Sequence, residues 1–144
     1  MGIAPAAAYS PSDAELRSIL GDARTIAIVG LSSKPWRDSN SVARFLQAKG
    51  YRIVPVNPNE TEVLGERAYS SLLGVPEPVD VVDVFRRAEF TPEVAEHAAR
   101  IGAKVLWLQE GIVNDEARRI AEDAGLVVIM GMCIHVVKQR LDEE

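Results

Sequence analysis

The chain has 144 residues, is 47% hydrophobic and carries a formal net charge of −5 at pH 7, which suits one domain with a buried core. The acidic balance disfavours nucleic acid and anionic membranes as partners, because both repel a negatively charged protein. The single cysteine, Cys133, excludes an intramolecular disulfide, and the two histidines show no spacing typical of a metal site, so we expect a reducing compartment and no bound metal.

The amino-terminal segment, residues 1–11, is predicted to be a flexible arm. It lacks the positively charged region of a secretory signal, and no apolar run of the chain approaches membrane-spanning length. We therefore expect a cytoplasmic protein whose one domain occupies residues 12–144. Ser12 and Glu15 form a capping box, which predicts a first helix from Ser12 to Asp22.

Strands and helices alternate along the rest of the chain. Runs of apolar, mostly β-branched residues predict strands at residues 25–29, 51–56, 79–85, 104–108 and 126–130. Apolar residues at helical spacing predict helices from about residue 40 to 50, at 91–102 with Thr91 as cap, at 115–124 with Asn114 as cap, and at 133–141. The irregular segment after the second strand has room for a short edge strand near residues 67–69 and one helical turn at 70–73.

This alternation predicts an α/β fold, a single-domain Rossmann-like doubly wound parallel sheet. We expect about five main strands plus a short edge strand, with helices on both faces. In such sheets ligands bind outside the carboxyl ends of the strands, where the strand order reverses. The residues that follow each predicted strand are therefore the candidates for a site.

The turn after the first strand has features of a phosphate site. Its glycine lets the backbone turn sharply where a ligand approaches. The hydroxyls and cations that follow lead into a helix, whose amino terminus offers unpaired amides and partial positive charge. The alternative is a solvated loop in which a serine caps the helix. The candidate residues here are Gly30, Leu31, Ser32, Ser33, Lys34, Arg37 and Ser39.

A dinucleotide site is less well supported. Its fingerprint needs two more glycines after Gly30 and an acid after the second strand, where this chain has Asn57 and Pro58. These two residues either contact a ligand or only shape a tight loop. A small NAD(P)-dependent oxidoreductase, or another nucleotide-dependent enzyme, remains the alternative hypothesis.

The third and fourth strands also end in candidate residues. Arg86 and Arg87 can hold phosphate or stack on an adenine ring beside Phe85, and ion pairs with nearby glutamates are the alternative. Glu110 follows the fourth strand, ahead of a flexible glycine. It either accepts a hydrogen bond from a ligand or caps neighbouring backbone amides.

Taken together, these strand ends resemble the CoA-binding domain family, small single-domain relatives of the amino-terminal domain of the succinyl-CoA synthetase alpha subunit. The resemblance covers about residues 25–141. The matching stretches are 28–32 with Pro35, Arg37 and Ser39, then 51–59, 63–66, 78–86 and 107–112. Each stretch alone is weak, but their order and spacing form a specific combination.

The resemblance implies that the chain binds coenzyme A or an acyl-CoA. The turn from Gly30 to Ser39 would hold the phosphates, and Asn57 and Pro58 would border the pocket. The adenine and ribose side would be lined by Phe85, Arg86, Arg87 and Ala88, and the pantetheine arm would face Glu110, Gly111 and Ile112. The loop departs from the family pattern at Asp38, Asn40 and Ser41.

No catalytic residue is predicted. Ligases related to this family use a histidine that becomes phosphorylated on a further domain. Neither His97 nor His135 shows a nucleophile–base arrangement, and Cys133 is interpreted as a structural thiol. We therefore expect a binding protein rather than an enzyme, with a homodimer or a partner protein as candidate assemblies.

Overall fold

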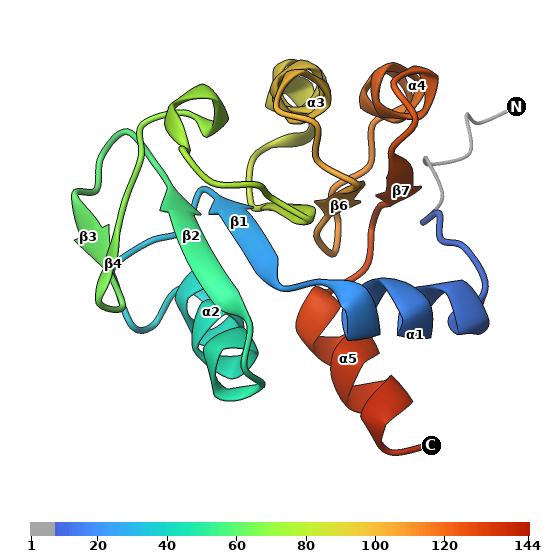
Figure 1. The fold of residues 1–144 in the computed structure, drawn as a ribbon, viewed down its shortest axis with the longest axis horizontal. Helices are drawn as coiled ribbons and strands as arrows, with labels where there is room; N and C mark the ends of the chain where they lie inside the picture. Colours follow the sequence, from blue (N-terminus) through green and yellow to red (C-terminus); the bar gives the residue numbers. More distant parts are fainter. Residues whose placement is uncertain (1–7) are drawn as a thin grey trace, which may run out of the picture.

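The computed structural model describes residues 8–144, which form one five-stranded parallel sheet between two layers of helices (Figure 1). The strands are β1 (Thr25–Val29), β2 (Arg52–Val56), β5 (Val81–Val84), β6 (Val105–Leu108) and β7 (Val127–Ile129). Their order across the sheet is β2-β1-β5-β6-β7. The predicted α/β doubly wound fold is confirmed.

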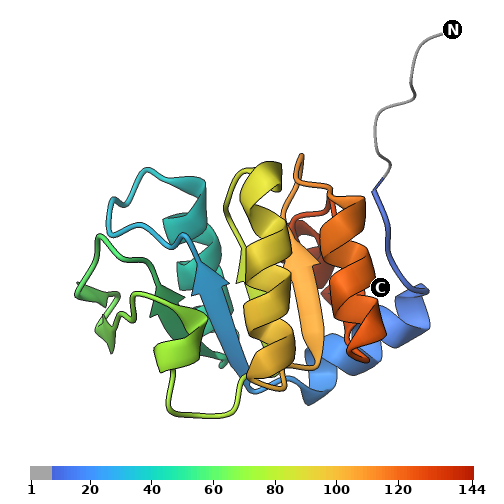
Figure 2. The same cartoon turned by 90° about the horizontal axis from the view of Figure 1, so that it is seen from above.

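The two faces of the sheet carry different helices. One face is covered by α3 (Thr91–Arg100) and α4 (Asp115–Asp123), which lie side by side across the strands (Figures 1 and 2). The other face is covered by α1 (Asp13–Asp22), α2 (Asp38–Ala48) and α5 (Ile134–Asp142). Helices on both faces are what parallel crossover connections require.

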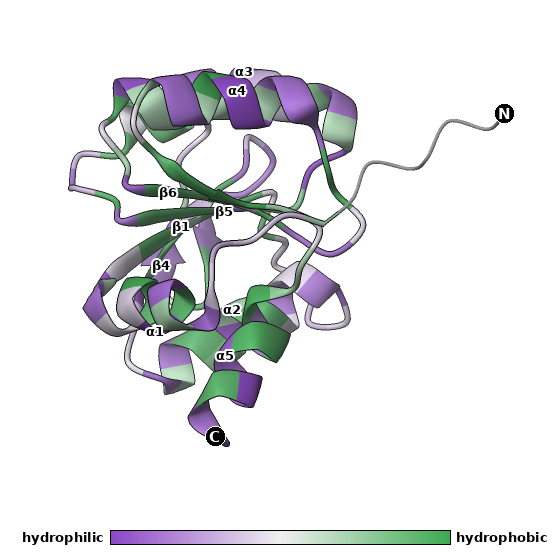
Figure 3. Cartoon of the chain, turned by 90° about the vertical axis from the view of Figure 1, so that its right-hand side faces the viewer, coloured by the Kyte–Doolittle hydropathy of each residue, from purple (hydrophilic) through white to green (hydrophobic). Residues whose placement is uncertain are grey.

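The core is divided by the sheet into two clusters. Ala27 and Val29 of β1 pack with α3 and α4, whereas Ile26 and Ile28 pack with α1, α2 and α5. Figure 3 shows the strands as a largely hydrophobic layer and much of the outer surface of α3 and α4 as hydrophilic. Coverage on both faces explains why the strands are continuous apolar runs in the sequence.

The segment after β2 folds differently from the prediction. It forms a small antiparallel hairpin from β3 (Glu62–Val63) and β4 (Glu66–Arg67), separate from the main sheet. The edge strand expected near residues 67–69 is reduced to a single parallel bridge between Val56 and Tyr69. The expected helical turn is present as a 3-10 turn, Leu72–Gly74.

The predicted caps at Ser12 and Asn114 are confirmed, because their side chains accept hydrogen bonds from the first turns of α1 and α4. The cap predicted at Thr91 is wrong. A 3-10 turn, Ala88–Phe90, runs directly into α3, so Thr91 is already helical and its hydroxyl donates to the Ala88 carbonyl at 2.6 Å.

Residues 1–7 of the expected arm lie outside the described residues. From residue 8 the chain is attached to the domain, because Tyr9 and Met130 exchange two backbone hydrogen bonds of 2.9 and 2.8 Å beside β7. In the described part of the chain, no helix has both the length and the apolar character needed to cross a membrane.

Candidate functional site

The strand order reverses between β1 and β5, because the chain goes from β1 to β2 on one side and returns to pair β5 on the other. Three adjoining cavities lie at the carboxyl ends of these strands, and Phe85 lines all three. We name them the basic cavity, the Asn57 cavity and the Cys133 cavity. This is the edge at which the sequence predicted a site.

Gly30 brings the ends of β1 and β5 together. It has a φ of 88°, and a Cβ at this position would overlap the backbone carbonyl oxygen of Phe85. The Phe85 amide donates to the Val29 carbonyl at 2.8 Å, and the Gly30 amide donates to the Val56 carbonyl at 2.8 Å. Only glycine combines this backbone conformation with so close an approach.

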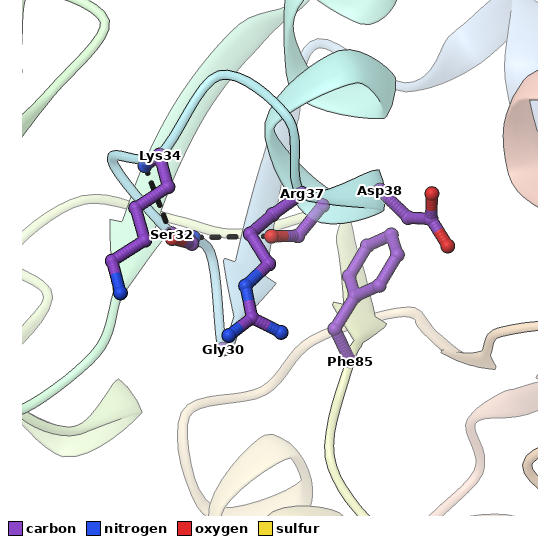
Figure 4. Close-up of a pocket in the computed structure, with 7 residues that line it drawn as sticks. Gly30, Ser32, Lys34, Arg37, Asp38 and Phe85 are labelled. Carbon is purple, nitrogen blue, oxygen red and sulfur yellow. Dashed lines mark hydrogen bonds between the residues drawn. The ribbon is translucent and has the colours of Figure 1, made fainter.

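The basic cavity has a volume of about 360 Å³ and lies over Gly30. Figure 4 shows the side chains of Lys34 and Arg37 extending in the same direction, whereas Asp38 points past Phe85 to the other side. The amino terminus of α2 adds first-turn amides that have no carbonyl partner inside the helix. Together, these amides and the side chains of Lys34 and Arg37 give this end of the site a positive character. The lining residues are Gly30, Ser32, Lys34, Arg37, Asp38, Ser39 and Phe85.

The helix that borders this cavity begins at Asp38, two residues earlier than predicted, and Arg37 occupies the N-cap position without a side-chain cap. Ser39 therefore does not cap the helix. It is buried in the first turn, and its hydroxyl accepts the Ser32 amide at 3.1 Å. The buried Asn40 donates to the Ser32 carbonyl at 2.9 Å. Both polar groups of the Ser32 backbone are thus tied to α2.

The amides of Ser32, Ser33 and Lys34 in this loop are already occupied. The Ser33 amide donates to the Glu60 carboxylate at 2.6 Å, and the Lys34 amide donates to the Ser32 hydroxyl at 3.1 Å. The loop is therefore not an open cradle of backbone amides of the kind that glycine-rich phosphate loops provide. In this geometry an anion would be held by side-chain cations and by the first turn of α2.

The Asn57 cavity has a volume of about 380 Å³ and lies between the ends of β1, β2 and β5. Asn57 donates to the Leu31 carbonyl at 3.1 Å and accepts the Asn59 amide at 2.9 Å. Its side chain therefore holds the loops after β1 and β2 together, as the tight-loop interpretation expected. The cavity is lined by Val29, Gly30, Val56, Asn57, Pro58, Asn59, Ser70, Phe85 and Arg86.

The two arginines after β5 are placed differently. Arg86 lines the Asn57 cavity, and its guanidinium carbon lies 4.9 Å from the centre of the Phe90 ring. Arg87 is exposed and lines none of the three cavities. Within residues 8–144 neither arginine forms an ion pair with a glutamate. The ion-pair alternative is therefore wrong for the described part of the chain.

The Cys133 cavity is the largest of the three, with a volume of about 500 Å³. It lies beyond Phe85, between the starts of α2 and α5 and the end of β6. Cys133 is the N-cap residue of α5, and the His135 ring stacks on Phe45 with the ring centres 3.7 Å apart. The lining residues are Asp38, Ser41, Val42, Phe85, Gln109, Glu110, Ile112, Cys133 and His135.

A buried acid lies close to this cavity. Asp83 of β5 is fully buried, and one carboxylate oxygen accepts a hydrogen bond from the side-chain amide of Gln109. The second oxygen, Oδ2, has no partner among the described residues. Burial raises the pKa of Asp83 to about 7, although the Gln109 hydrogen bond opposes this shift. The sequence contains a signal for this feature, because an acid inside a strand covered on both faces is unusual. No role was predicted for Asp83.

Most of the predicted site residues line the three cavities. They are Gly30, Ser32, Lys34, Arg37, Ser39, Asn57, Pro58, Phe85, Arg86, Glu110 and Ile112. Leu31, Ser33, Arg87, Ala88 and Gly111 do not line them. The Leu31 side chain is fully buried in the core, so only its backbone remains near the site. The Ala88 carbonyl is occupied by Thr91 and Asn114.

Sequence reasoning did not assign ten of the lining residues to the site. They are Val29, Asp38, Ser41, Val42, Val56, Asn59, Ser70, Gln109, Cys133 and His135. Asp38, Ser41 and His135 lie in the first turns of α2 and α5, and Cys133 caps α5. A correct prediction of where these two helices begin would have indicated these four residues. Across residues 8–144, no group of three or more His, Cys, Asp or Glu side chains gathers closely enough to hold a metal ion.

The model of the CoA binding domain family matches residues 24–139. The chain belongs to this family. It is 46% identical over 127 residues to the uncharacterized protein YneT of Bacillus subtilis, covering 88% of this chain and 94% of that protein. A solved structure of a hypothetical protein from Pyrococcus horikoshii has a TM-score of 0.89 and 41% identity, and the match covers 91% of this chain and 92% of that one.

The family also relates the chain to part of longer enzymes. The alpha subunit of an ADP-forming acetate–CoA ligase from Pyrococcus furiosus is 32% identical over 108 residues. That match covers 69% of this chain but only 23% of the ligase subunit. The chain thus corresponds to about a quarter of that subunit and to almost the full length of YneT.

Proposed function

We propose that the chain binds coenzyme A or an acyl-CoA at the carboxyl edge of its sheet, around Phe85. The observation that carries this proposal is the row of three adjoining cavities at the point where the strand order reverses, with both loop cations at one of them. Membership of the CoA-binding domain family supports the same ligand.

The distribution of charge suggests how the ligand lies. The phosphates of CoA belong beside Lys34 and Arg37, because these two cations line the basic cavity. The adenine and ribose side would occupy the Asn57 cavity, where Arg86 can stack on the base. Glu60, which holds the Ser33 amide, keeps the loop in the shape that presents Lys34.

The pantetheine arm would then extend past Phe85 into the Cys133 cavity. No lysine or arginine lines this cavity, so it does not attract the phosphates. Glu110 and Ile112 line it, and Gly111 lets the chain turn between them with a φ of 80°. The thiol or acyl end of the ligand would lie near Cys133.

Binding to NAD(P) is disfavoured by the same geometry. A dinucleotide site uses an acid after the second strand to hold the ribose hydroxyls, whereas the lining of the Asn57 cavity includes no carboxylate. Asn57 uses both side-chain groups within its own loops. We propose binding as the function, with no catalytic step assigned to these residues.

Calorimetric titration of the purified chain with CoA and with NAD at equal concentrations tests the proposal. CoA should give a saturable heat with one site per chain, and it should raise the melting temperature because it stabilises the folded state only. NAD should do neither. Saturable binding of NAD without binding of CoA would overturn the proposal.

A further inference from the structure

The Cys133 cavity differs in charge from the rest of the binding edge. Its lining includes two carboxylates, Asp38 from the start of α2 and Glu110 from the turn after β6, and no lysine or arginine. Arg37 lines the basic cavity, and Figure 4 shows Asp38 turned to the opposite side of Phe85. Phe85 thus lies between a cavity lined by two cations and Asp38 and a cavity lined by Asp38 and Glu110 without a cation.

The remaining walls of this cavity are mostly uncharged. Val42 is buried in α2, Ile112 is half-buried, and the ring of Phe85 closes the side toward the phosphates. His135 also lines the cavity, and its ring stacks on Phe45. A short aliphatic group could therefore contact apolar side chains here while the two carboxylates stay at the rim.

We infer that the Cys133 cavity holds the acyl group of an acyl-CoA and selects uncharged short acyl groups over acyl groups that end in a carboxylate. This inference rests on the proposed function and names its ligand class. A terminal carboxylate in this cavity would lie among the residues that include Asp38 and Glu110, and like charges repel. Glu110 is the specificity-determining residue, because Asp38 also lines the basic cavity and affects the phosphates.

Two features of the cavity oppose this selection and are weaker. The amino termini of α2 and α5 both begin at the cavity, and each helix terminus carries about half a positive charge. The two full negative charges of Asp38 and Glu110 outweigh the two partial ones. Because Asp38 and Glu110 are exposed, water screens them, and we expect selection of about fivefold to tenfold rather than complete exclusion.

Calorimetric titration with malonyl-CoA and isovaleryl-CoA tests the inference. The two acyl groups have the same branching, with two carboxylate oxygens in one replaced by two methyl groups in the other, so they differ mainly in charge. Free CoA serves as the reference ligand. The full chain should bind isovaleryl-CoA at least about fivefold more tightly than malonyl-CoA.

Two substitutions identify the cause of the selection. Glu110→Gln should move the ratio of the two dissociation constants toward one, mainly by tightening malonyl-CoA. Glu96→Gln makes the same change of charge at an exposed position of α3, and it should leave the ratio unchanged. Equal binding of the two acyl-CoAs, or a ratio that responds equally to both substitutions, would overturn the inference while leaving CoA binding intact. Failure of free CoA and both acyl-CoAs to bind would instead overturn the proposed function.

Discussion

The side-chain amide of Asn40 donates a hydrogen bond of 2.9 Å to the backbone carbonyl of Ser32. Asn40 is buried, and its side-chain oxygen accepts from the Arg44 guanidinium at 3.0 Å. This contact fixes the loop after β1 on the first turn of α2. The position of Lys34 and Arg37 therefore depends on a residue that does not line the basic cavity.

Replacing Asn40 with alanine should lower both stability and ligand affinity. The variant leaves the Ser32 carbonyl without its partner, so we expect the free energy of unfolding to fall by about 1–2 kcal/mol. CoA should bind several-fold more weakly, because the loop cations are no longer held. Urea unfolding and calorimetry measure the two effects. Asn59→Ala, at an exposed asparagine, is the stability control, and equal unfolding curves for the two variants would count against the role of Asn40.

Gly30→Ala should be more costly. The new methyl group would overlap the Phe85 carbonyl, and the residue would have to keep a φ of 88°. We expect a loss of at least about 2 kcal/mol in the free energy of unfolding. Gly21→Ala is the matched control, since Gly21 lies in α1 with no atom near its Cβ position. That change should be neutral or stabilising. A Gly30→Ala variant as stable as the native protein would show that β1 and β5 can separate here at little cost.

Arg37→Ala should weaken CoA but leave pantetheine binding almost unchanged. Only CoA presents phosphates to the basic cavity, and removal of one cation should cost about tenfold in the CoA dissociation constant. Calorimetry with the two ligands measures the difference. Arg119→Ala, at an exposed position of α4, should change neither. An equal loss for CoA and pantetheine would exclude a phosphate role for Arg37.

Asp83 should make stability decrease with rising pH. Burial raises its pKa from 3.8 to about 7, so between these values the folded state keeps a proton that the unfolded state has released. Below about pH 4 the protonation of Asp83 makes its full contribution to the free energy of unfolding. This contribution is lost as the pH rises to about 7. The loss is at most about 4 kcal/mol and then stays constant.

Asp83→Asn should flatten this dependence, because the amide does not ionise. Urea unfolding at pH 5 and pH 8 should give a smaller difference for the variant than for the native protein, with the variant gaining relative stability at pH 8. Asp123→Asn, exposed at the end of α4, should keep the native difference. If Asp83→Asn and Asp123→Asn have equal pH dependences, Asp83 does not ionise in the way described.

Local patterns in the sequence were sufficient for the fold. The apolar run 26–29 indicated a strand covered on both faces, and Ser12 and Asn114 marked helix starts through bonds to amides three residues away. The placement of candidate residues after each strand followed from the parallel sheet alone. These features depend on neighbours in the chain, which is why the sequence predicts them.

Features that depend on tertiary contacts were predicted poorly. Ser39 has the residue type of a helix cap, yet it is buried and bonds the Ser32 backbone instead. Leu31 follows a strand as a ligand contact would, but its side chain is in the core. Thr91 has the form of a cap, and the preceding 3-10 turn makes it helical. In each case the residue type fits two roles. The contacts that the residue makes in the folded structure decide between them.

The direct test of the central claim is to locate the CoA site by amide chemical shifts in a nuclear magnetic resonance titration. We expect the largest changes at Gly30, Arg37, Phe85 and Glu110, around the carboxyl ends of β1, β5 and β6. The amino ends of the strands offer a competing cavity of about 470 Å³, lined by Arg24, Lys49, Arg52 and Lys138 among others. Changes concentrated around Gly50 and Tyr51 in that cavity, with Gly30 and Phe85 unaffected, would contradict CoA binding where the strand order reverses.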